Sequence, residues 1–179
     1  MILADILQWF LLILGAFLTL NAHWLGAHAL APALVSRARE RYVASPVKVT
    51  LVGLAIATPV LALAIGVGNA VPHPVVKALC AGLGLLTGLL ALIGSAGLAE
   101  RIGLGLPAER DEQQPWRRVL RGGALLGLAF LMPFLGWFVL LPWTLISGLG
   151  AWALAGRAPA PVRLSMDAAS SVSGASATA

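Results

Sequence analysis

The clearest shortage in this sequence is of charged residues. Aspartate, glutamate, lysine and arginine make up 11% of the 179 residues, whereas about 25% is ordinary for soluble domains. Hydrophobic residues make up 59%, against roughly 45–50% in soluble domains. A water-soluble globule of this size needs a polar shell, which this chain cannot supply. We therefore expect a single-domain, all-α polytopic transmembrane helical bundle of about four spans.

Cysteine and catalytic groups are also scarce. The one cysteine, Cys80, lies inside an apolar run, so no internal disulfide can form. Acidic residues occur only in loops and at the ends of apolar runs, and neither a Ser–His–Asp set nor a pair of buried carboxylates is evident. We expect a protein that is not an enzyme, with no catalytic residue, cofactor or metal site.

Ionisable side chains are absent from most of the apolar sequence. Residues 49–69, 78–99 and 122–156 contain no Asp, Glu, Lys, Arg or His, although proton-coupled pumps usually carry such a residue within the membrane. Hydroxyl side chains remain, and we expect them to hydrogen-bond within their own helix or to a neighbour. They are Thr50, Thr58, Thr87, Ser95, Thr144 and Ser147.

The first apolar region covers residues 6–35, which is too long for one perpendicular span. It is either one tilted helix or a span followed by an interfacial helix, because His23 and Trp24 are types that favour the headgroup zone. His23 and His28 are five residues apart, about 140° on a helix, so they cannot ligate one ion together. They are interfacial or packing residues or, alternatively, ligands to a cofactor.

The same region could be mistaken for a cleaved signal peptide. Ala27-His28-Ala29 resembles a small-x-small cleavage site, but no Lys or Arg precedes the apolar run. The apolar character also continues past this site, so we expect a retained membrane helix.

Two further helices are expected in the middle of the chain. Ser45-Pro46 is a favoured N-cap followed by a favoured first residue, so the second helix should run from there to residue 67, kinked at Pro59. A turn at 68–74 precedes a third helix over 75–99. Residues 100–121 form the largest water-facing segment outside the tail, either an interfacial helix or a solvated loop.

The last apolar region, residues 122–155, would reach about 51 Å as one helix. Pro133, Gly136 and Pro142 interrupt it, so we expect two arms, either a hairpin or a half-helix followed by a full span. The break could also form a re-entrant tip that lines a pore. Residues 158–179 are rich in Ser and Ala and are expected to be a disordered tail after a transmembrane domain at 1–157.

Basic residues gather in two expected loops, which we call the two basic segments; this indicates membrane orientation and argues against a nucleic-acid surface. An even number of spans separates the two segments, so they lie on one side, which we expect to be cytoplasmic, with the N-terminus and His73 outside. The residues are Arg37, Arg39, Arg41 and Lys48 in the first segment and Arg101, Arg110, Arg117, Arg118 and Arg121 in the second. Arg157 and Arg163 favour a cytoplasmic tail.

Glycine spacing is the strongest positive signal. Gly84 and Gly88 are four residues apart on the third helix, and Gly123 and Gly127 open the last region. Small residues at this spacing let another helix approach closely. They serve either packing within the chain or assembly with a second copy or a membrane-protein partner.

Three blocks of sequence are similar to a known family. They are Pro32-Ala33-Leu34-Val35-Ser36-Arg37 running on to Lys48, Gly97-Leu98-Ala99-Glu100-Arg101-Ile102-Gly103, and Met132-Pro133-Phe134-Leu135-Gly136-Trp137. Over residues 30–157 the chain resembles the membrane region that accompanies bactofilin-like, polymer-forming bacterial proteins. The β-rich polymerising segment of that family has no counterpart here. The resemblance implies a bacterial inner-membrane scaffold or anchor.

The sequence thus predicts a non-enzymatic inner-membrane scaffold, anchor or accessory subunit that assembles through its glycine-rich helix faces. A small channel or transporter built around the break at 133–142 is the alternative. A third hypothesis is an anchor subunit that carries haem or quinone.

Overall fold

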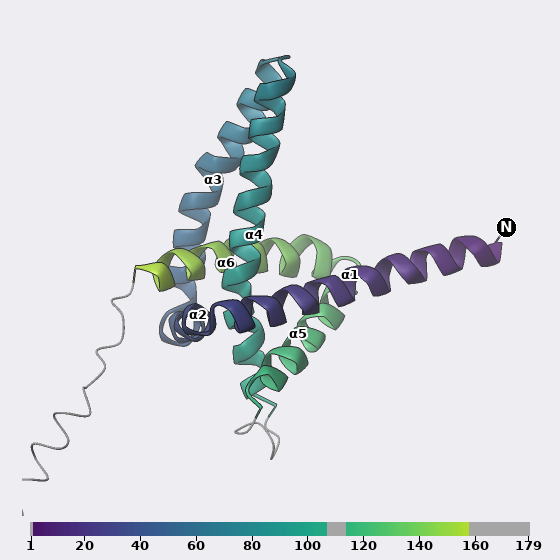
Figure 1. Ribbon diagram of the computed structural model, residues 1–179, viewed down its shortest axis with the longest axis vertical. Helices are drawn as coiled ribbons and strands as arrows, with labels where there is room; N and C mark the ends of the chain where they lie inside the picture. Colours follow the sequence, from purple (N-terminus) through teal and green to yellow (C-terminus); the bar gives the residue numbers. More distant parts are fainter. Residues whose placement is uncertain (1, 107–113, 158–179) are drawn as a thin grey trace, which may run out of the picture.

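The protein is a bundle of helices. The computed structural model describes residues 2–106 and 114–157, in which there is no strand (Figure 1). The elements are α1 (Ile2–Leu30), α2 (Pro32–Ala44), α3 (Pro46–Ala70), α4 (Pro74–Leu104), α5 (Trp116–Phe130), the π-helix η1 (Gly136–Leu140) and α6 (Leu141–Gly156). The predicted all-α class is confirmed. The predicted tail at 158–179 lies outside the described residues.

Four segments are long and apolar enough to cross a membrane. They are Leu3–Leu30, Pro46–Ala70, Pro74–Leu104 and Gly136–Gly156. The chain is therefore a multi-pass membrane protein, as its composition predicts. The 31 residues of α4 extend about 46 Å, which exceeds a hydrocarbon core of about 30 Å. This helix must therefore tilt or extend beyond the core.

Proline accounts for the start of three helices. Pro32, Pro46 and Pro74 occupy the first turn of α2, α3 and α4, where the missing N–H costs no helical bond. The first apolar region is therefore not one helix, because Ala31 interrupts it before Pro32. The predicted start at Ser45-Pro46 is confirmed, although the Ser45 side chain makes no capping hydrogen bond.

Three expected boundaries differ from those in the structure. The third predicted helix was to end at residue 99, but α4 continues to Leu104 with Glu100 buried at 5% exposure. The segment expected to face water, residues 100–121, is shorter because α4 extends into it and α5 begins at Trp116. Helix α3 passes through Pro59 and ends at Ala70.

Helices α3 and α4 form a long antiparallel hairpin whose tip is the turn at residues 71–73 (Figure 1). Helices α1 and α6 cross this hairpin steeply, near its other end (Figure 1). We call that end the base; it consists of α2, residues 46–53 of α3 and residues 91–104 of α4. The first half of α1 projects away from the base and exposes Leu3, Leu7 and Trp9.

Glycines allow the helices to cross at the base with their backbones in contact. A Cβ atom on Gly150 would lie 2.7 Å from the backbone nitrogen of Gly53, and one on Gly122 would lie 2.6 Å from that of Gly103. Side chains do not fit at such distances, so each crossing requires glycine. The facing pairs are Gly53 with Gly150 for α3 and α6, Gly94 with Gly148 for α4 and α6, and Gly103 with Gly122 for α4 and α5.

Candidate functional site

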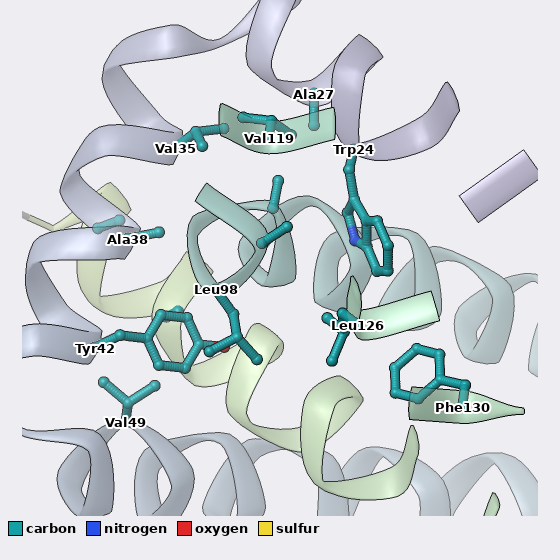
Figure 2. Close-up of a cluster of buried hydrophobic side chains, with 14 residues drawn as sticks. Trp24, Ala27, Val35, Ala38, Tyr42, Val49, Leu98, Val119, Leu126 and Phe130 are labelled. Carbon is teal, nitrogen blue, oxygen red and sulfur yellow. The ribbon is translucent and has the colours of Figure 1, made fainter. Parts of the chain in front are cut away.

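Two large aromatic residues occupy opposite sides of the core (Figure 2). Trp24 enters from α1 and lies near Leu126 and Phe130, whereas Tyr42 enters from α2 and lies near Val49 (Figure 2). Both side chains are fully buried. Trp24 therefore packs inside the protein, with its indole enclosed by other helices.

Each aromatic residue is held by a serine on another helix. The Trp24 indole N–H donates to the Ser95 hydroxyl at 2.9 Å, and the Tyr42 hydroxyl donates to that of Ser147 at 3.1 Å. Burial raises the pKa of the Tyr42 phenol well above its ordinary value, and the bond to Ser147 opposes this only in part. These bonds connect α1 to α4 and α2 to α6.

The predicted role of the hydroxyl side chains is largely confirmed. Thr50 and Thr87 donate to the carbonyl oxygens four residues before them. Ser95 and Ser147 donate to the carbonyls of Leu92 and Thr144. The Thr144 hydroxyl differs, because it is buried and has no hydrogen-bond partner in the described part of the chain.

An ion pair joins α2 to the end of α4. The Arg39 guanidinium donates to Glu100 Oε1 at 3.0 Å, and the Arg101 guanidinium donates to the Tyr42 carbonyl at 2.6 Å. The Glu100 side chain is 6% exposed and that of Arg39 is 25% exposed. A buried carboxylate is stable only with such a partner. Sequence reasoning missed Glu100, since nothing local indicates that a glutamate at the end of an apolar run is enclosed.

The two basic segments lie at the same end of the hairpin. Gly97 of α4 contacts Ala38 and Arg39 of α2, and Gly103 contacts the backbone of Arg118 on α5. Lys48 is in the first turn of α3, and the Arg117 guanidinium lies 5.5 Å from the centre of the Trp116 ring. The prediction that these basic residues lie in loops was wrong, because the described ones lie on α2, α3, α4 and α5. Arg37 donates to the Ala33 carbonyl and Arg41 is exposed on α2, while Arg121 follows on α5. Arg110 lies outside the described residues.

The four predicted packing glycines fall into two groups. Gly123 and Gly127 face α1, where a Cβ on either would lie 2.8 Å from Trp24 or Phe17. Gly84 and Gly88 are half-buried, yet a Cβ on either would have nothing within 4 Å. The first pair therefore packs within the chain, and the second pair lies on a stretch of α4 that no other described helix covers within 4 Å of an added Cβ.

The helix break lies beside a cavity. Pro133 is in the turn between α5 and η1, Gly136 begins η1, and Pro142 is in the first turn of α6. A cavity of about 600 Å³ separates this break from α1. A second cavity of about 200 Å³ adjoins it and shares Leu20, Phe130 and Leu141 with it; Thr144 is also among its lining residues.

The histidines form no metal centre. His73 caps α4 at the tip of the hairpin, where its Nδ1 accepts from the Val75 N–H at 3.3 Å. His23 and His28 lie on α1, each half-buried with one ring nitrogen unpaired. The described residues contain no group of three or more His, Cys, Asp and Glu side chains that could hold a metal ion.

No protein-family model, curated protein or solved structure matches the chain. Function must therefore be argued from the membrane helices, the base, the open glycines and the cavities.

Proposed function

We propose that the protein is a non-enzymatic membrane scaffold, anchor or accessory subunit that assembles through the α4 face carrying Gly84 and Gly88. The supporting observation is that a Cβ atom on either glycine would have no other described residue within 4 Å, apart from the adjoining residues and backbone of α4 itself. Small residues at this spacing let a neighbouring helix come close enough for backbone contact. A second copy or another membrane protein would supply that helix.

The arrangement of charge supports an orientation for this scaffold. Both basic segments lie at the base, opposite the tip at residues 71–73. Because Lys and Arg favour the cytoplasmic side, we place the base in the cytoplasm and the tip outside. We also propose the bacterial inner membrane as the location, which rests on the resemblance to the membrane region of bactofilin-like proteins.

Assembly can be tested with one glycine and a matched control on the same helix. Gly88→Leu should lower self-association, or association with a copurifying partner, by roughly tenfold or more. Gly82→Leu is the control, because Gly82 is exposed and also has nothing within 4 Å of its Cβ. The measurement is energy transfer between labelled copies in vesicles, together with affinity purification from the native membrane.

Unchanged association of the Gly88→Leu protein, with both variants folded, would remove this face from the proposal. If both variants lose association equally, the added side-chain volume on α4 weakens association and close approach at Gly88 does not explain it.

The alternative is a small channel or transporter built around the break at 133–142. The cavity of about 600 Å³ beside Pro133 and Trp137 favours it. A flux assay in liposomes separates the two functions, since a scaffold leaves the vesicles sealed to ions and small solutes.

A further inference from the structure

Cationic side chains gather where α2 ends and α3 begins, which we call the α2–α3 junction. Arg41 lies in the last turn of α2 and Lys48 in the first turn of α3, and both residues are exposed. The Arg101 guanidinium reaches the same junction from α4, where it donates to the Tyr42 carbonyl. Three helices therefore bring positive charge to one place.

The acidic residues of the base do not neutralise these three cations. Within the base, the acidic side chains that the structure describes are Glu40 and Glu100. Arg39 pairs with both, at 3.9 Å from Glu40 Oε1 and 3.0 Å from Glu100 Oε1. The α2–α3 junction is thus left with an excess of positive charge, which attracts an anion from outside the base.

An apolar groove adjoins the first turn of α3. It has a volume of about 280 Å³ and is lined by Pro46, Val47, Thr50, Leu51 and Trp143. Val47 is 70% exposed and Leu51, one turn nearer the tip, is 60% exposed. The Thr50 hydroxyl already donates to the Pro46 carbonyl. The groove therefore suits a hydrocarbon chain, which offers no hydrogen bond and needs none.

We propose that the α2–α3 junction binds an anionic phospholipid. The phosphate lies among Arg41, Lys48 and Arg101, and one acyl chain follows the groove past Leu51 toward the tip. Lysine and arginine at a membrane surface attract anionic lipid, and each such residue strengthens binding by about fivefold. Trp143, which borders the groove, is a residue type enriched at the level of lipid headgroups. This inference does not depend on the α4 face used in the proposed assembly.

Other ligands satisfy only one half of this arrangement. A soluble phosphate would neutralise the three cations but would leave Val47 and Leu51 uncovered. A zwitterionic phospholipid would fill the groove, but its own choline or amine charge offsets its phosphate and leaves the excess charge of the junction in place. An anionic phospholipid supplies both the negative charge and the chain.

The test is native mass spectrometry of the purified full-length protein with phosphatidylglycerol or phosphatidylcholine, each carrying the same acyl chains. Phosphatidylglycerol should bind about tenfold more tightly. Lys48→Gln should weaken phosphatidylglycerol binding by about fivefold and leave phosphatidylcholine binding unchanged. Lys77→Gln is the matched control, because Lys77 is also exposed near the start of a spanning helix, at the tip. It loses the same charge and should bind as the wild type does.

Arg41→Gln repeats the test from α2 with a second exposed residue and should give a similar loss. Equal affinity for the two lipids overturns the proposal. Equal losses in Lys48→Gln and Lys77→Gln also overturn it, because binding would then follow net charge and not the junction. Glycerol 3-phosphate separates a lipid from a soluble anion: in excess it should not displace phosphatidylglycerol, and displacement would mean that the groove has no part in binding.

Discussion

Glycines occur both at the base and in the half of the α3–α4 hairpin nearer the tip, but their surroundings are opposite. At the base, Gly94 and Gly103 of α4 touch the backbones of α6 and α5. About two turns nearer the tip, a Cβ atom added to Gly84 or Gly88 of the same helix would have no neighbouring residue within 4 Å. The comparison shows that glycine spacing marks where another helix could pack closely. Whether a helix does pack there depends on where the other helices of the fold are placed.

The largest effect that tests this comparison is expected at Gly94. Gly94→Ala would place a methyl group against the Gly148 carbonyl and 2.9 Å from the Trp152 nitrogen. Backbone atoms cannot move aside as a side chain can, so we expect a loss of about 3 kcal/mol or failure to fold. Denaturant titration in detergent measures this loss. If Gly94→Ala unfolds at the same denaturant concentration as the wild type, α4 and α6 do not cross with their backbones in contact.

A smaller effect is expected at Tyr42, which connects α2 to α6 at the base. Tyr42→Phe should cost about 1 kcal/mol at neutral pH, because it removes the hydrogen bond to Ser147. The wild-type protein should also become less stable as the pH rises past about 10, the ordinary tyrosine value. The unfolded phenol then loses its proton, whereas burial raises the pKa of the folded one.

Tyr42 is the only tyrosine in the sequence, so the variant isolates this dependence. Unfolding curves from pH 7 to 11 should show the difference between wild type and Tyr42→Phe narrowing above pH 10. A constant difference would mean that the phenol titrates alike in the folded and unfolded states.

The smallest effect on stability is expected at Gly84, in the half of the hairpin nearer the tip. Gly84→Ala adds a methyl group where nothing lies within 4 Å, and alanine has the higher helix propensity. We expect a gain of about 0.5–1 kcal/mol. Measured beside Gly94→Ala, this is the same substitution on the same helix with the opposite sign. A loss of stability in Gly84→Ala would show that another helix already packs against Gly84 in the folded protein.

Much of the fold follows from local sequence. The apolar runs predict the four candidate spans, and Ser45-Pro46 predicts the start of α3, since span length and helix starts depend on adjacent residues. The break at Pro133 and Gly136 is local in the same way. The burial of Trp24, in contrast, is not visible in the local sequence, because its hydrogen-bond partner Ser95 is 71 residues away.

The candidate site was predictable only in part. Gly84, Gly88, Gly123 and Gly127 have the four-residue spacing that sequence reasoning recognises, and this spacing does not separate the open pair from the packed pair. The pairs Gly53–Gly150 and Gly103–Gly122 have no such spacing, since each partner lies on a different helix. The burial of Glu100 could not be predicted for the same reason, because its neutralising partner Arg39 is 61 residues away in the sequence.

The sequence by itself determined that this is an α-helical membrane protein with four candidate spans and two basic segments. The reason is that transfer into lipid depends on the composition of each segment, one segment at a time. Only the tertiary structure decided which glycines lie at helix crossings, which aromatic and acidic residues are buried, and where the two cavities beside the helix break lie. Each of those properties depends on the distance between helices that are far apart in the chain, and no local pattern encodes that distance.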